Sequence, residues 1–169
     1  MAGPEPLDVP ASTSQQPDPT AIVADTDVLA ADLLVGGIAR EALDLVRSHS
    51  WLSVLASETL LAETRAVVTT LAGSDLADRW YARISEDARL VDHPDGDHPA
   101  LASAYHGGAA HLLTFDERLQ SPQAAVRLQQ RFPISVRSPD AFVATFDVDG
   151  VHEAIFGEPY DGPDVDPRE

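Results

Sequence analysis

The stretch AIVADTDVL, residues 21–29, places a short apolar run directly before two acidic residues and the start of a helical pattern. Ala21–Ala24 is too short for a helix and predicts a buried strand, which Asp25 and Asp27 follow at once. A helical pattern then begins near Val28. A buried strand that turns into a helix is the first half of a strand–helix–strand unit, so this stretch favours an α/β fold.

The same alternation continues along the chain to residue 146. Further strands are predicted at 52–55, 89–91, 111–114 and 134–136, and helices at 28–35, 37–48, 57–71, 75–86, 98–106, 122–131 and 139–146. Repeated alternation of this kind predicts a parallel sheet with helices on both faces, which is a three-layer α/β/α architecture. In such sheets, functional sites form at the carboxyl ends of strands, where the winding direction switches.

Both ends of the chain have a different composition. Residues 1–20 contain five prolines with Ser, Thr and Gln between them, which predicts a disordered leader. Residues 147–169 carry eight acids and one arginine, which predicts an acidic tail with one short helix at 151–156. We therefore expect one α/β domain at 21–146.

The composition limits the classes of function. The 169 residues include 28 acids and 11 basic residues, all of them arginine, for a net charge of -17. A lysine-free, acid-rich surface is typical of proteins that work in molar salt, where screening removes the repulsion between carboxylates. The absence of cysteine excludes disulfides, thiolate zinc sites and cysteine catalysis. We expect a cytoplasmic protein without a membrane span, because there is neither a secretory signal nor a long apolar run.

Four acids carry the functional prediction. Asp25 follows the first predicted strand and Asp116 follows the fourth, so the two carboxylates share one rim of the sheet if these strands are neighbours. Glu63 borders the apolar side of its helix, which predicts a partly desolvated carboxylate. Asp97 precedes His98, where a helix begins. Taken singly, these acids fit a turn, a solvent-facing side chain or a helix cap, so the prediction depends on their joint placement.

Four motifs in order resemble the PIN-domain ribonuclease family, here in a haloarchaeal-type member. They are IVADTDVL at 22–29, SETLLAE at 57–63, DGDHPALA at 95–102 and GGAAHLLTFDERL at 107–119. The resemblance covers about residues 21–137. It implies a five-stranded parallel sheet in the order 3-2-1-4-5, which places the first and fourth strands side by side.

The resemblance also implies a role for each acid. Asp25, Glu63, Asp97 and Asp116 would be the catalytic residues and the metal ligands, and Asp92 or Asp95 competes with Asp97 for the third position. Thr114 would orient a carboxylate. Asp27 stands where the family often has Asn, so it would be either a spare ligand or a turn residue.

Clustered carboxylates repel one another unless a cation lies between them. Oxygen ligands without cysteine or paired histidines favour Mg²⁺ or Mn²⁺ over zinc. A bound ion of this kind can activate water and stabilise charge on a phosphodiester, and the resemblance implies that the substrate is RNA, with Arg40, Arg65 and Arg118 as candidate phosphate contacts. By the same resemblance, we expect an RNA substrate and a homodimer, whereas the sequence leaves open whether the chain is a toxin with an antitoxin partner or a processing nuclease.

Two other functions remain open from the sequence. The same fold with an incomplete set of acids would be an inactive PIN-like binding or scaffold module. Asp25-Thr26-Asp27 after a strand also matches the start of haloacid-dehalogenase-type phosphatases. That family uses a lysine in its site, and this chain has none.

Overall fold

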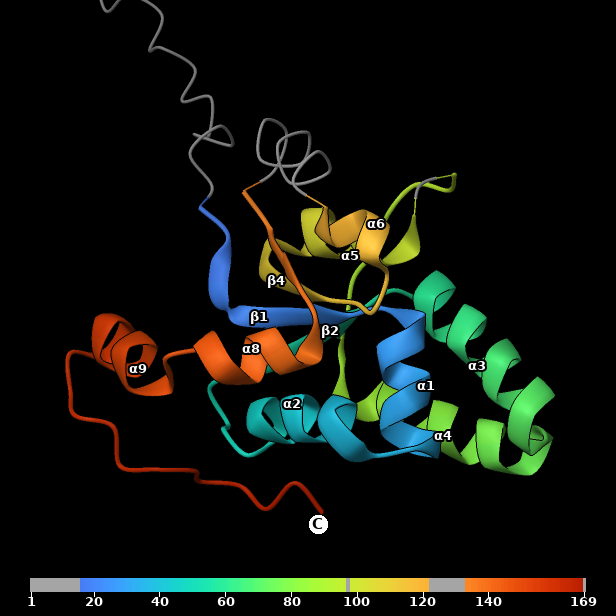
Figure 1. Cartoon of the computed structure of the whole chain (residues 1–169), viewed down its shortest axis with the longest axis horizontal. Helices are drawn as coiled ribbons and strands as arrows, with labels where there is room; N and C mark the ends of the chain where they lie inside the picture. The colour runs from blue at the N-terminus through green and yellow to red at the C-terminus, as the bar shows by residue number, and fades with distance from the viewer. Residues whose placement is uncertain (1–15, 97, 122–132, 169) are drawn as a thin grey trace, which may run out of the picture.

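The protein folds around a five-stranded parallel sheet in the order β3-β2-β1-β4-β5 (Figure 1). The computed structural model describes residues 16–96, 98–121 and 133–168. The strands are β1 (Asp18–Ala24), β2 (Ser53–Ala56), β3 (Arg89–Leu90), β4 (Ala109–Leu113) and β5 (Ser135–Arg137). The predicted α/β class and the predicted strand order 3-2-1-4-5 are both confirmed.

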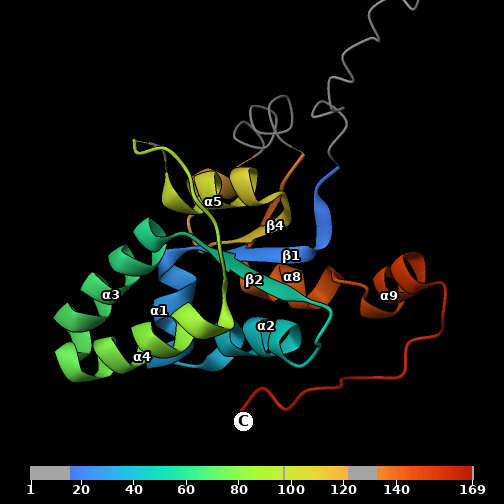
Figure 2. The same ribbon diagram turned by 180° about the vertical axis from the view of Figure 1, so that it is seen from behind.

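Helices cover both faces of the sheet. They are α1 (Thr26–Leu34), α2 (Gly37–Arg47), α3 (Glu58–Ala72), α4 (Ser74–Asp87), α5 (Pro99–Gly107), α6 (Glu117–Gln120), α8 (Pro139–Thr145) and α9 (Val148–Phe156). In Figure 1, α5 and α6 lie above the sheet, and α1, α2 and α8 lie below it. The view from behind shows α3 and α4 side by side at one flank (Figure 2).

The core is centred on β1, the middle strand. Residues Ala21–Ala24 are almost fully buried because β2 and β4 pair with this strand on either side and helices cover both of its faces. Ile22 aligns with Val54 of β2 and with His111 of β4. This burial on both faces explains why the strand reads as a continuous apolar run in the sequence.

Local signals set several helix boundaries where the sequence predicts them. Ser57 caps α3, since its hydroxyl oxygen accepts a hydrogen bond from the Leu60 amide at 3.1 Å. Gly108 ends α5 with a left-handed backbone, at a φ of 69°, which glycine adopts without strain. The Ser57 cap holds the start of α3 at the carboxyl end of β2, whereas Gly108 joins the end of α5 to the start of β4 at the opposite edge of the sheet.

The structure extends or alters some predicted elements. β1 begins at Asp18, before the apolar run, and α6 is an additional short helix that Asp116 caps. The helix predicted at 122–131 lies outside the described residues, as do residues 1–15 of the predicted leader.

The acidic C-terminal segment packs on the domain. α9 is longer than the predicted helix, and its Val148 and Val151 contact the core. Further along, the amides of Asp164 and Val165 donate to the Ser48 carbonyl at 3.0 and 3.1 Å. The segment therefore returns to the end of α2 (Figure 2). Within the part of the chain that the structure describes, no helix has the length and apolar character of a membrane span.

Candidate functional site

Three carboxylates converge on the segment that follows β4. The Asp25 amide donates to the Leu113 carbonyl at 2.8 Å, which places the end of β1 against the end of β4. The buried Thr114 hydroxyl donates to Oδ2 of Asp25 at 2.9 Å and accepts from the Asp116 amide at 3.0 Å. Thr114 therefore joins the two strand-end acids, and its predicted role in orienting a carboxylate agrees with this geometry.

Asp25 is held from two sides. The residue is 8% exposed, and Oδ1 accepts from the Thr26 amide at 2.8 Å, which makes Asp25 the N-cap of α1. The partial positive charge at a helix N-terminus favours an anion at this position. His98, at the start of α5, places Nε2 at 3.9 Å from Oδ2 of Asp25, an ion-pair distance when the ring is protonated.

The carboxylate of Asp27 is affected by the negative charges of both Asp25 and Asp116. Its Oδ2 accepts from the Phe115 amide at 3.1 Å, whereas its Oδ1 is buried and has no hydrogen-bond partner among the described residues. Burial raises the pKa of Asp27, and the negative charge of Asp25, with a smaller effect from Asp116, raises this pKa further. Asp27 lies in the first turn of α1 and is close enough to Asp25 and Asp116 for their charges to act on it, so both roles that the sequence left open, a spare ligand and a turn residue, stay open.

The pKa of Asp116 is shifted in the opposite direction to that of Asp27. Hydrogen bonds from Arg118, whose Nη2 lies 3.2 Å from Oδ2 of Asp116, hold the pKa of that carboxyl below its usual range. The site thus contains one carboxylate that stays ionised and one that retains a proton more readily.

Glu63 and Asp97, the other two predicted acids, do not complete a described cluster. The prediction that Glu63 is desolvated is wrong, because the buried stripe of α3 runs through Leu60, Leu61, Thr64 and Val68 and leaves Glu63 exposed. Asp97 lies outside the described residues, and its two competitors, Asp92 and Asp95, are both exposed. Among the residues with described positions, no three acidic or histidine side chains are close enough to hold a metal ion as they stand.

Only one of the three candidate phosphate-binding arginines lies at these acids. Arg118 is 91% exposed beside Asp116. Arg65 pairs instead with Asp78 of α4, and Arg40 donates to the main-chain carbonyl of Asp32. The expectation that Arg40 and Arg65 serve this site is therefore not supported by their contacts.

One protein-family model matches the part of the chain that contains all of these acids. Residues 16–168 match the family described as "Family of unknown function (DUF7384)". The chain belongs to this family. A search of curated proteins returned no significant match.

Sequence reasoning missed one buried ion pair in the DUF7384 chain. Asp32 of α1 is 6% exposed, and its carboxylate accepts two hydrogen bonds from Arg47 of α2, at 3.1 and 2.7 Å. The signal was present in the sequence, since Asp32 lies four residues after Val28 and three after Leu29, on the apolar side of its helix. An acid at such a position needs a cationic partner, but the spacing does not say which one.

Proposed function

We propose that this chain is a PIN-like, divalent-metal-dependent ribonuclease that hydrolyses RNA phosphodiester bonds. The observation that supports it best is that three acidic residues meet at the segment after β4, beside the end of β1: Asp25 accepts from the Thr114 hydroxyl, Asp27 accepts from the Phe115 amide, and the Asp116 amide donates to Thr114. In parallel sheets, this edge at the switch of winding direction is where ligands bind.

The donor set fits Mg²⁺ or Mn²⁺. Asp27 has a buried oxygen that no described residue hydrogen-bonds, and its pKa is raised by burial first and then by the negative charge of Asp25. Carboxylate oxygens are the ligands that these hard cations prefer. Asp25, Asp27 and Asp116 would hold the ion, and the family resemblance adds Glu63 and Asp97. When bound, such an ion supplies an activated water and stabilises charge on the phosphodiester.

The other residues of the site would prepare it for an anionic substrate. Thr114 keeps Oδ2 of Asp25 in place, and the backbone amide of Phe115 keeps Oδ2 of Asp27 in place. Arg118 offers an exposed guanidinium beside Asp116, where a phosphate of the RNA would come close to the acids. A net charge of -17 weakens RNA binding at low salt, so we expect activity in concentrated salt.

The experiment measures cleavage of labelled single-stranded and hairpin RNA in about 2 M KCl, where charge repulsion is screened. We expect cleavage with Mn²⁺ or Mg²⁺ and none with EDTA. Asp25→Asn and Asp116→Asn should each lower the rate by about 100-fold or more, because they remove transition-state stabilisation worth several kcal/mol. The matched control is Glu117→Gln, which neutralises the exposed acid beside Asp116 and should leave the rate unchanged.

A thermal-shift measurement separates the alternatives. If Mn²⁺ raises the melting temperature of the wild type but not of Asp25→Asn, the ion binds at these acids. Cleavage that survives both substitutions comes from another protein and refutes the proposal. If neither cleavage nor a metal-dependent shift occurs, the chain is a PIN-like binding module instead.

A further inference from the structure

Five arginines line one hollow on the side of the molecule away from the acids of β1 and β4. The hollow has a volume of about 390 Å³ and lies between the last turn of α1, α2, α4 and the C-terminal segment. Its arginines are Arg40, Arg47, Arg79, Arg83 and Arg168, and we call it the arginine hollow. Asp25 is at the opposite end of α1, so this is a separate site.

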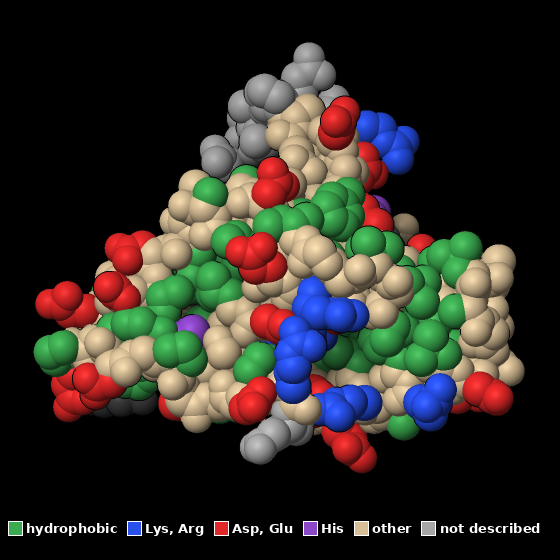
Figure 3. Space-filling view, turned by 60° about the horizontal axis from the view of Figure 1, so that its bottom comes forward, with side chains coloured by type: hydrophobic (Ala, Val, Ile, Leu, Met, Phe, Trp, Pro, Cys, Tyr) green, Lys and Arg blue, Asp and Glu red, His purple; other side chains and the backbone are tan. Residues whose placement is uncertain are grey.

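The arginine hollow is a local concentration of positive charge in an acidic chain. Its five guanidinium groups face three carboxylates, those of Asp32, Asp44 and Asp87, which leaves a surplus of two positive charges. The chain as a whole has only 11 basic residues and a net charge of -17. Figure 3 shows arginine side chains gathered on this face, with acids spread around them. An anion would therefore be drawn to this hollow rather than to the surrounding surface.

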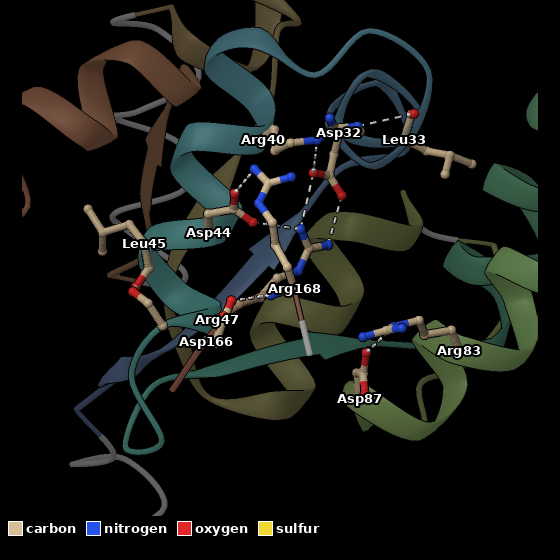
Figure 4. Close-up of polar contacts among 11 residues, drawn as sticks. Asp32, Leu33, Arg40, Asp44, Leu45, Arg47, Arg83, Asp87, Asp166 and Arg168 are labelled. Carbon is tan, nitrogen blue, oxygen red and sulfur yellow. Dashed lines mark hydrogen bonds and ion pairs between the residues drawn. The ribbon is translucent and has the colours of Figure 1, made fainter. Parts of the chain in front are cut away.

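One wall of the hollow is held rigidly. The Asp32 carboxylate binds the guanidinium fork of Arg47, while the Asp32 main-chain carbonyl accepts from Nε and Nη2 of Arg40 at 3.2 and 2.7 Å. Arg168 of the C-terminal segment lies 3.3 Å from Asp44. Figure 4 shows these three guanidinium groups gathered around the two carboxylates. Groups held in this way lose little conformational entropy when a ligand binds.

The opposite wall presents exposed cations. Arg79 and Arg83 lie one turn apart on α4, and both are exposed. Arg79 donates to the Asp75 carbonyl at 3.4 Å, and no carboxylate among the described residues lies within ion-pair distance of it. Arg83 lies 3.5 Å from Asp87 on the same helix (Figure 4). The charge of Arg79 therefore remains available for a ligand in the hollow.

The size and lining of the hollow suit a small molecule. Its volume falls in the range of about 300–1,000 Å³ that is usual for small-molecule sites. Apolar side chains of Leu33, Leu76 and Ile84 line it together with the arginines. Pro167 and Arg168 also contribute to its lining, so the C-terminal segment borders the hollow.

We propose that the arginine hollow binds a small molecule that carries two or more linked phosphate groups. The planar guanidinium group donates two parallel hydrogen bonds to phosphate oxygens, and arginines on two facing walls match phosphates that are joined in a chain. Inorganic polyphosphate and a nucleoside triphosphate share this chemistry. The apolar residues distinguish them, because only a nucleoside would contact these side chains.

The test is calorimetric titration of the full chain with inorganic tripolyphosphate and with ATP, in about 1 M KCl with EDTA, where screening leaves only direct contacts. We expect saturable binding of one molecule per chain. The double variant Arg79→Gln/Arg83→Gln should weaken it by about 10-fold to 100-fold, since two charge-assisted contacts are lost. Both arginines are exposed, so this variant should fold, which its melting temperature checks. The matched control is Arg137→Gln, which lies on β5 outside the hollow.

Each outcome bears on the proposal. Tighter binding of ATP than of tripolyphosphate supports it and assigns the apolar wall to a nucleoside, whereas equal binding supports it and assigns the affinity to the phosphates. Absence of binding by both probes overturns it, and so does equal binding by the wild type and the double variant. If an RNA oligonucleotide binds through Arg79 and Arg83 but tripolyphosphate does not bind, the hollow is part of a nucleic-acid surface and the proposal is wrong.

Discussion

His111 should make the fold less stable as the pH falls through the mildly acidic range. His111 is on β4, and its ring packs against Phe142 of α8 and against Phe146, which follows the last residue of α8. The distances between ring centroids are 5.6 Å to Phe142 and 5.4 Å to Phe146. Burial, and then the positive charge of Arg137, lower the pKa of His111 from 6.5 to about 4. Its Nδ1 is buried, and no residue in the described part of the chain hydrogen-bonds it. The folded protein therefore holds this ring neutral.

The direction of the pH effect on stability follows from the difference in proton binding between the folded and the unfolded chain. Above pH 6.5, the ring is neutral in both the folded and the unfolded chain, and its contribution to stability is fully present. Between pH 6.5 and about 4, the unfolded chain binds a proton that the folded chain does not, so stability falls with falling pH. At pH 5 the loss is about 1–2 kcal/mol, because the full shift would give about 2 kcal/mol and residual exposure screens part of it. For a chain of this size, that corresponds to a decrease in melting temperature of about 2–8 °C.

The assay compares the free energy of unfolding at pH 7.5 and pH 5 for the wild type and His111→Leu at constant salt. Carboxylates also titrate in this range, but they do so in both proteins, so the difference isolates His111. We expect the variant to lose about 1–2 kcal/mol less than the wild type. Arg137→Gln should give an intermediate slope, and His106→Gln, which removes an exposed ring, should match the wild type. Equal pH slopes for the wild type and His111→Leu would refute the reasoning.

Two other predictions concern the charged groups of α1. Asp27→Asn should raise the melting temperature in EDTA at pH 7.5, because the raised pKa of Asp27 means that its ionised form destabilises the fold. The gain should disappear as the pH falls, since the wild-type carboxyl then becomes protonated. A lower melting temperature for this variant in EDTA would contradict the assignment. Asp32→Asn should lower the free energy of unfolding by about 3 kcal/mol in urea titrations, because it leaves Arg47 partly buried without its main partner. The double variant Asp32→Leu/Arg47→Met should recover most of this loss, and a loss of under about 1 kcal/mol in Asp32→Asn would show that Asp44 alone compensates Arg47.

Much of the architecture could be read from local patterns. β1, β2 and β4 each pair with another strand on both sides. Their buried residues form short apolar runs that stand out in the sequence. Ser57 and Gly108 mark helix ends through chemistry that needs only their immediate neighbours. The first three residues of β1 were missed because Asp18, Pro19 and Thr20 are not apolar and sit at the margin of the sheet.

The candidate site was predictable only in part. Asp25 and Asp116 could be paired in advance because each directly follows a strand, and parallel strands end at one edge. Glu63 was misplaced because helical spacing identifies the side of α3 that faces the core, but a residue at the border of that side can point either way. The buried, unpartnered oxygen of Asp27 depends on how closely the segment after β4 packs on the start of α1.

Periodicity and capping residues report on each element in relation to its own axis, and they were sufficient for the elements, their alternation and the acids at the strand ends. They contain no information on which residues of separate elements come into contact. Arg47 reaches Asp32 from 15 positions away, and Arg168 reaches Asp44 from 124 positions away. The raised pKa of Asp27, the lowered pKa of His111 and the arginine hollow all arise from contacts of this kind. Such contacts form only when packing of the core brings distant segments together, because burial and Coulomb energies depend on distances in space rather than along the chain.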